Sequence, residues 1–281
     1  MKLFRHGAPG AERAGAVDSQ GVRRDLSLLV ADITPAWLNP AKLAALAAID
    51  LTRLPALGAD VRIGPPVNGI RQFIAIGLNY GKHAAETGAP NPKEPIVFNK
   101  AITCIQGPDD VVVLPRGSEQ SDWEVELGVV IGRTARGVSK ANALSYVAGY
   151  VLANDMSERH WQTQRGGQWV KGKSFDTFGP LGPYLVTSDE IPDPQQLPLS
   201  LKLNGVTRQD SSTGDMIFSV AEIVAYLSDV MTLLPGDVIV TGTPEGVGLG
   251  QKPPVFLKGG DVMELDGGVL GRQRQTVHAA S

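Results

Sequence analysis

Thiols are almost absent from this sequence, which has one cysteine, Cys104, among 281 residues. A single cysteine excludes an intrachain disulfide and a thiolate metal site. The motifs HExxH, Gly-x-Ser-x-Gly and CxxC do not occur. Their absence argues against a zinc protease, a serine hydrolase with a nucleophile elbow and a dithiol redox enzyme.

Long apolar runs and basic clusters are missing as well. No apolar run approaches the roughly 20 residues that a membrane helix requires, and the first residues lack the apolar stretch of a signal peptide. The formal net charge is −3, with no cluster of Lys and Arg that could follow a phosphate backbone. We therefore expect a cytoplasmic protein that binds neither a membrane nor nucleic acid.

Glycine and proline are abundant but dispersed, with 33 and 20 residues, and helical periodicity is scarce. This pattern predicts many short strands joined by tight turns, in a β-rich α+β fold. We expect a small N-terminal α/β domain over residues 1–65 and a larger domain over 70–281, separated by a stretch rich in Pro and Gly. Helices are predicted over 39–49, where Asn39 is the N-cap, and over 220–230, where Ser219 and Glu222 form a capping box.

Two carboxylates occupy alternate positions in the segment Asp122-Trp-Glu-Val-Glu-Leu-Gly128. Apolar residues alternate from Trp123 to Ile131, which predicts a strand over 123–132 with one buried face. Glu124 and Glu126 then share the other face, roughly 6.5–7 Å apart along the strand, and would repel each other without a cation. Carboxylate oxygens without Cys or His nearby suit Mg²⁺ or Mn²⁺. The alternative is an ordinary solvated strand face.

Five further residues carry groups suited to chemistry. Asp155 ends an apolar strand pattern, where it could be a ligand or a helix N-cap. His83 and Glu86 share a helix face if their segment is helical, and a carboxylate beside imidazole supports a general base; the alternative is an incidental surface pair. Lys100 and Lys173 stand in apolar or glycine surroundings, where either could pair with a substrate carboxylate or an enolate, or simply be a surface lysine.

Five segments together resemble the fumarylacetoacetate hydrolase superfamily, over residues 70–277 and in the family's order. They are Gly77-Leu-Asn-Tyr-Gly-Lys-His83, Glu124-Val-Glu-Leu-Gly128, Asn154-Asp-Met-Ser157, Gly172-Lys-Ser-Phe175 and Pro235-Gly-Asp-Val-Ile-Val-Thr-Gly-Thr-Pro-Glu-Gly-Val-Gly248. Each segment alone is a weak signal, whereas the set in this order is specific. The chain is most similar to the short bacterial branch and the acylpyruvase-like members. It departs from many relatives at Leu78, where they have Arg.

The resemblance implies a mixed β-sheet roll with a small N-terminal domain, and a homodimer. It implies that Glu124, Glu126 and Asp155 bind Mg²⁺ or Mn²⁺, with water or substrate completing the coordination. His83, Glu86 and Lys173 would be catalytic. The residues expected to contact a small 2-keto acid substrate are Tyr80, Lys100, Arg159, Gln162 and Thr243.

The activity that the resemblance favours is hydrolysis of 2,4-diketo-3-deoxy-L-rhamnonate or -fuconate to pyruvate and lactate. Such relatives are often labelled ureidoglycolate lyases. Acylpyruvate hydrolase, oxaloacetate decarboxylase and an isomerase of a homoprotocatechuate-type intermediate stay open, because each starts from a chelated 2-keto acid. A metabolite-binding protein without activity is the alternative outside the enzymes.

Overall fold

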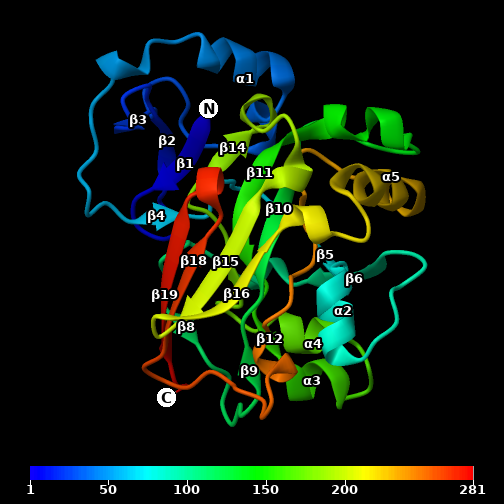
Figure 1. Cartoon of the computed structure of the whole chain (residues 1–281). Coiled ribbons are helices and arrows are strands. Elements are labelled where there is room, and N and C mark those ends of the chain that lie inside the picture. The colour runs from blue at the N-terminus through cyan, green and yellow to red at the C-terminus, as the bar shows by residue number, and fades with distance from the viewer. Residues whose placement is uncertain (281) are drawn as a thin grey trace.

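The computed structural model describes residues 1–280 and shows a β-rich α+β fold, as predicted from the sequence. A large mixed sheet forms the body of the molecule, and a smaller sheet lies against it (Figure 1). In spatial order the large sheet contains β3 (Arg23–Asp25), β2 (Arg13–Val17), β1 (Lys2–His6), β14 (Leu185–Thr187), β11 (Val147–Asn154), β10 (Val125–Ile131), β17 (Val238–Val240), β5 (Phe73–Gly77) and β6 (Ile96–Lys100), with β4 (Ile63–Gly64) paired to β1.

The smaller sheet lies over the middle of this large sheet, where it contacts β10, whereas the helices lie around the two sheets (Figure 1). In spatial order the smaller sheet contains β16 (Val206–Ser212), β15 (Pro198–Leu203), β18 (Val262–Asp266), β19 (Arg272–His278) and β8 (Val112–Val113). Two short pairs join β9 (Ser121–Asp122) to β12 (Ser157–Glu158) and β7 (Ile105–Gln106) to β13 (Gly179–Pro180). The α-helices are α1 (Pro40–Ala47), α2 (Gly81–Thr87), α3 (Arg159–Thr163), α4 (Val170–Lys173) and α5 (Val220–Val230).

Strands β10 and β11 are buried along their whole length. The sequence predicted a strand over 123–132 with one buried face, whereas β10 begins at Val125 and every residue in it is buried. The prediction of a single buried face was wrong because the smaller sheet packs on the face of Val125, while the other face turns toward the loop after β17 and a buried cavity, where the N–H of Gly242 donates to Glu126. Glu126 therefore lies inside the protein and is 1% exposed.

Both predicted helices form, and each begins directly after the capping residue identified in the sequence. Helix α1 starts at Pro40, and the side chain of Asn39 accepts a hydrogen bond from the N–H of Ala41. Helix α5 has the full capping box between Ser219 and Glu222, and its apolar stripe is buried. Local sequence decides these ends because the cap satisfies N–H groups that have no partner within the helix.

The N-terminal strands continue the large sheet. Strand β1 pairs with β14, so that Lys2 lies opposite Val186. An ion pair of 2.5 Å between Arg62 and Asp110 ties the end of this N-terminal part to the segment that follows β7. The backbone and its charged side chains thus connect the first 65 residues to the body of the molecule.

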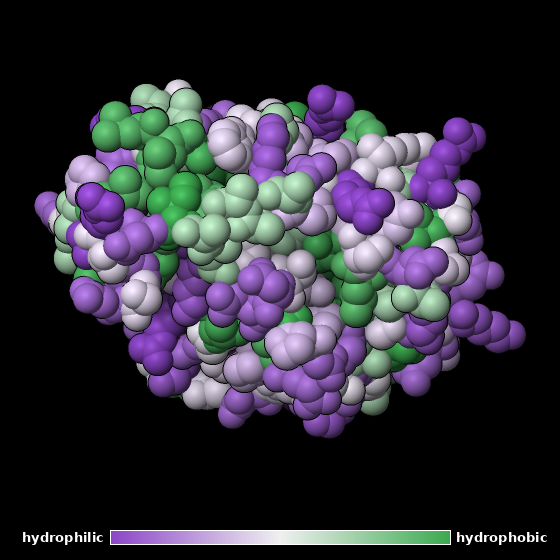
Figure 2. Space-filling model, turned by 90° about the horizontal axis from the view of Figure 1, so that it is seen from above, coloured by the Kyte–Doolittle hydropathy of each residue, from purple (hydrophilic) through white to green (hydrophobic). Residues whose placement is uncertain are grey.

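The surface is mixed in character. Figure 2 shows hydrophilic and hydrophobic residues interspersed on the face seen from above, with one continuous hydrophobic area toward the left. Among residues 1–280, no helix combines the length and the apolar character that crossing a membrane requires.

Candidate metal centre and cavity

The pairing of β10 with β11 brings three carboxylates together. Val125 lies opposite Asn154 in this antiparallel pair, so Glu124 and Asp155 emerge at the same end of the two strands. The backbone N–H of Asp155 donates to the carbonyl of Glu124 at 2.9 Å. Glu126 follows within β10, and one oxygen from each of the three carboxylates lies within 4.8 Å of the others.

Of the three carboxylates, Glu126 has the fewest partners to offset the cost of burying its charge. Its Oε2 accepts a hydrogen bond from the backbone N–H of Gly242 at 2.7 Å, and the ion pairs within residues 1–280 do not include it. Burial, and then the charges of Asp155 and Glu124, raise the pKa of the Glu126 carboxyl well above its usual range. A positive charge placed beside it would favour its ionised form.

Lys173, the last residue of α4, joins the other two carboxylates. Its Nζ lies 2.6 Å from Oε2 of Glu124 and 2.8 Å from Oδ2 of Asp155. Burial alone would raise the pKa of Glu124, but the charges of Lys173 and Arg159 lower it to about 2. Burial alone would lower the pKa of Lys173, but Asp155 and Glu124 raise it. Glu124 and Lys173 therefore both stay charged at neutral pH.

Arg159 connects the cluster to Asp122, a residue to which the sequence assigned no role. Its Nη1 lies 2.7 Å from Oε1 of Glu124, and its Nε donates to Oδ2 of Asp122 at 2.8 Å. Asp122 also accepts hydrogen bonds from the backbone N–H groups of Gly248 and Leu249, at 2.7 and 3.0 Å. Asp122 thereby fixes both Arg159 and the loop after β17.

His83 and Glu86 form a pair on α2, as their spacing predicted. Nδ1 of His83 lies 2.8 Å from Oε1 of Glu86, and Glu86 also accepts from the backbone N–H of Gly246 at 3.0 Å. An ionised carboxylate can only accept hydrogen bonds, so Nδ1 of His83 carries the proton and Nε2 is left as an acceptor.

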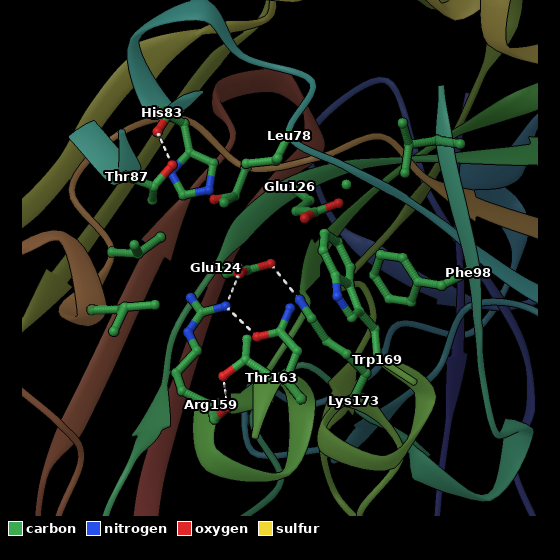
Figure 3. Close-up of a pocket in the computed structure, with 16 residues that line it drawn as sticks. Leu78, His83, Thr87, Phe98, Glu124, Glu126, Arg159, Thr163, Trp169 and Lys173 are labelled. Carbon is green, nitrogen blue, oxygen red and sulfur yellow. Dashed lines mark hydrogen bonds and ion pairs between the residues drawn. The ribbon is translucent and has the colours of Figure 1, made fainter. Parts of the chain in front are cut away.

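A cavity of about 150 Å³ separates α2 from the carboxylates (Figure 3). A cavity of this volume is known to hold a benzene ring, so it suits a small ligand. Its lining has a polar side, with Glu124 and Arg159, and an apolar side. We call the side chains of Leu78, Phe98 and Trp169 the apolar wall; Figure 3 shows the two aromatic rings next to each other, across the cavity from His83.

The structure brings most of the predicted site residues to this cavity. The lining includes His83, Glu124, Glu126, Arg159, Gln162, Lys173 and Thr243. Asp155 and Glu86 lie directly behind it, against Lys173 and His83. Tyr80 and Lys100 are buried outside the lining. Nζ of Lys100 lies 2.6 Å from Oδ1 of Asp155, so the structure places it against a predicted ligand.

Thr243 is held by a residue that sequence reasoning missed. Its Oγ1 donates to the carbonyl of Val125 at 2.9 Å and accepts from Nε2 of Gln209 at 2.8 Å. The Oε1 of Gln209 accepts from the N–H of Val125 at 3.0 Å. Gln209 belongs to β16 of the smaller sheet, and no local pattern relates it to β10.

The residues of the cluster fit a divalent cation. The three carboxylates offer oxygen donors close together, and Glu126 is buried without a cationic partner within residues 1–280. Hard ions such as Mg²⁺ and Mn²⁺ prefer carboxylate oxygens, whereas Zn²⁺ more often takes His and Cys.

Comparison with known families and relatives agrees with this geometry. The family described as fumarylacetoacetate (FAA) hydrolase C-terminal matches residues 72–278. A protein of Burkholderia cenocepacia is 55% identical over 281 residues, which is 100% of each chain. Its name presents it as an inferred hydrolase and states no substrate.

Two solved structures cover the whole of this chain and are covered wholly by it. A probable 2-hydroxyhepta-2,4-diene-1,7-dioate isomerase of Mycobacterium abscessus has a TM-score of 0.82 and 34% identity. Maleylpyruvate hydrolase of Sphingobium sp. SYK-6, in complex with manganese(II) and pyruvate, has a TM-score of 0.83 and 29% identity. One of these two neighbours is thus named as a hydrolase and the other as a probable isomerase.

Proposed function

Because this chain belongs to the fumarylacetoacetate hydrolase family, we propose that it uses water to cleave a carbon–carbon bond of a 2,4-diketo acid and releases pyruvate. The observation that carries the proposal is the cavity in which His83 faces the buried carboxylates Glu124 and Glu126. The maleylpyruvate hydrolase with bound manganese and pyruvate supports it. The derivatives of L-rhamnonate and L-fuconate expected from the sequence belong to this class and stay candidate substrates.

Glu124, Glu126 and Asp155 would hold the divalent ion, Mg²⁺ or Mn²⁺. When bound, such an ion supplies positive charge to the 2-oxo acid end of a substrate and to the enolate that develops there. Lys173 holds Glu124 and Asp155 in a fixed position. Arg159 orients Glu124 from the other side.

His83 is the general base in this proposal. With Nδ1 bound to Glu86, Nε2 takes a proton from a water molecule that adds to the C4 carbonyl. The C3–C4 bond then breaks, and its electron pair passes to the pyruvate half as an enolate, whose charge Lys173 helps to stabilise. A proton added at C3 gives pyruvate, and the C4 half leaves as a carboxylic acid.

The test is release of pyruvate from acetylpyruvate, a simple 2,4-diketo acid, with and without Mg²⁺. We expect release only with the metal, and a fall in kcat of about 10²–10⁴-fold in His83→Gln, the usual contribution of a general base. The matched control is His278→Gln, because His278 is an exposed histidine at the end of β19. Full activity of His83→Gln, or pyruvate release after removal of all metal, would contradict the proposal.

An isomerase is the second candidate, supported by the Mycobacterium abscessus neighbour. The same preparation should be given a 2-hydroxyhepta-2,4-diene-1,7-dioate substrate, oxaloacetate and ureidoglycolate, with pyruvate and glyoxylate measured. Isomerisation without cleavage of any diketo acid would favour this candidate.

A further inference from the structure

We propose that the apolar wall restricts this protein to 2-oxo acids whose remaining half carries no charge. This inference rests on the proposed function, because it concerns the half of the diketo acid that lies away from the carboxylate cluster. All candidate substrates share the 2,4-diketo acid group. Among them, the apolar wall would favour those with an uncharged acyl group over those with a second carboxylate.

The cationic side chains that line the cavity, Lys173 and Arg159, already form ion pairs with acidic residues. Lys173 contacts both Glu124 and Asp155. Arg159 contacts Glu124 and Asp122, with distances of 2.7 and 2.8 Å. If either turned toward a second carboxylate, two ion pairs of buried acidic groups would break, which is strongly unfavourable.

Cations on the neighbouring segments are engaged outside the lining. Nζ of Lys82 lies 3.7 Å from Oε1 of Glu245. The guanidinium of Arg165 lies over the ring of Trp161, 4.1 Å from its centroid. Within residues 1–280, then, the lining offers a distal carboxylate no cation that lacks an acidic partner of its own.

Close packing of side chains on the backbone holds the apolar wall in place. The rings of Phe98 and Trp169 meet edge to face, with centroids 5.3 Å apart. Trp169 lies directly on the backbone of Gly77, where an added Cβ would fall 2.3 Å from the ring. Leu78 lines the cavity on the side of His83 in Figure 3 and has a φ of 51°, a left-handed conformation that is costly for leucine. Such strain at a cavity-lining residue indicates that the position of this side chain matters.

A carboxylate against this wall would lose its hydration without gaining a partner. An uncharged acyl group would instead bury its carbon atoms there. Hydroxyl groups remain acceptable, because Gln162 and Thr163 also line the cavity. The substrate class is therefore a monocarboxylic 2,4-diketo acid, in contrast to maleylpyruvate, which the manganese-bound neighbour is named for.

The test compares binding of two 2-oxo acids of similar size with Mg²⁺ present, by isothermal titration calorimetry. These are 4-methyl-2-oxopentanoate, with an apolar end, and 2-oxoglutarate, with a second carboxylate. We expect the first to bind at least about 10-fold more tightly, in line with the discrimination that apolar pockets achieve. Equal or tighter binding of 2-oxoglutarate, or no binding of either acid, overturns the proposal.

Variants at Leu78 make the test specific. Leu78→Arg places a cation in the wall and should shift the ratio of the two dissociation constants toward 2-oxoglutarate by about 10-fold or more. Leu78→Met, with the same backbone position and a similar volume, should keep the preference of the unaltered protein. An unchanged ratio in a folded Leu78→Arg protein would count against the wall as the selecting element.

Turnover separates this inference from the proposed function. Acetylpyruvate should be cleaved with a kcat/KM at least about 10-fold above that of maleylpyruvate. If neither diketo acid releases pyruvate but the binding preference holds, the proposed function fails and the inference about the wall stands. If both are cleaved equally well and 2-oxoglutarate binds as tightly, only the inference about the wall fails.

Discussion

Glu126 is a buried carboxylate whose neighbours are mainly other carboxylates. A single N–H group, from Gly242, accompanies it, while Asp155 and Glu124 raise its pKa after burial has already done so. Burying an uncompensated charge costs several kcal/mol. The metal-free protein should therefore be less stable than its core alone would allow, and a divalent cation should restore the difference.

Replacing this carboxylate tests that argument directly. Glu126→Gln keeps an oxygen for the Gly242 N–H group but removes the charge, so we expect a higher Tm than the unaltered protein in metal-free buffer. Mg²⁺ or Mn²⁺ should raise the Tm of the unaltered protein, because an ion at 100 times its Kd adds about 2.7 kcal/mol. That rise should be absent in Glu126→Gln.

The matched control for this measurement is Glu264→Gln. Glu264 is an exposed glutamate on β18, so its replacement should leave both the metal-free Tm and the metal-dependent rise as they are. A metal-dependent rise of the same size in Glu126→Gln would show that the ion binds elsewhere.

Individual side chains of the site differ in how far the sequence could predict them. Glu124 and Glu126 could be predicted as ligands because two carboxylates on one face of a strand repel each other unless a cation lies nearby. Asp122 was visible in the same segment, but its contact with Arg159 depends on the pairing of β9 with β12. Gln209 had no local signal at all, because it reaches Thr243 from another sheet.

Strand β5 and the turn into α2 position the apolar wall. Gly77 ends the strand, and its missing side chain provides the space that Trp169 occupies. Only three residues, 78–80, connect the end of β5 to α2, the helix that carries His83.

The change Gly77→Ala should displace the ring of Trp169. An added methyl group at 2.3 Å cannot be accommodated, so we expect a loss of about 1–3 kcal/mol of unfolding free energy and altered tryptophan fluorescence. The matched control is Gly81→Ala at the start of α2, where nothing lies within 4 Å and alanine favours the helix by about 0.5–1 kcal/mol. A Gly77→Ala protein as stable as the unaltered one would contradict the packing described.

Helices were predicted more accurately than the environment of the strands. The caps at Asn39 and Ser219 are local, so α1 and α5 could be placed from sequence. The alternation of apolar residues predicted β10 correctly as a strand. It did not predict that both faces of this strand are buried. Alternation alone cannot distinguish a solvated face from one covered by other parts of the chain, and the face that carries Glu126 turns toward the loop after β17 and a buried cavity.

One edge of the large sheet is formed by a strand that pairs with a neighbour on one side only. Strand β6 is the last in the large sheet, and its residues from Ile96 to Phe98 are only half-buried. An edge strand presents free N–H and C=O groups, and an apolar one favours contact with another chain. The homodimer expected from the sequence stays a prediction, and this edge is a candidate for its interface.

Multi-angle light scattering tests the assembly. We expect a mass of twice 29.7 kDa at micromolar concentration, and dissociation on dilution only if the interface is small. A mass of 29.7 kDa over the whole concentration range would refute the dimer.

The pairing of β1 with β14 also sets a time order on the ribosome. Lys2 leaves the exit tunnel long before Val186, its partner in the sheet, has been synthesised. At about 5–20 residues per second the delay is on the order of ten seconds or more. During that time β1 has only β2 and β4 beside it, and the part of its edge at Lys2 and Leu3 that later pairs with β14 stays open. The first strands of this protein are therefore made early but complete their pairing late, which makes the nascent N-terminal segment a natural client for chaperones.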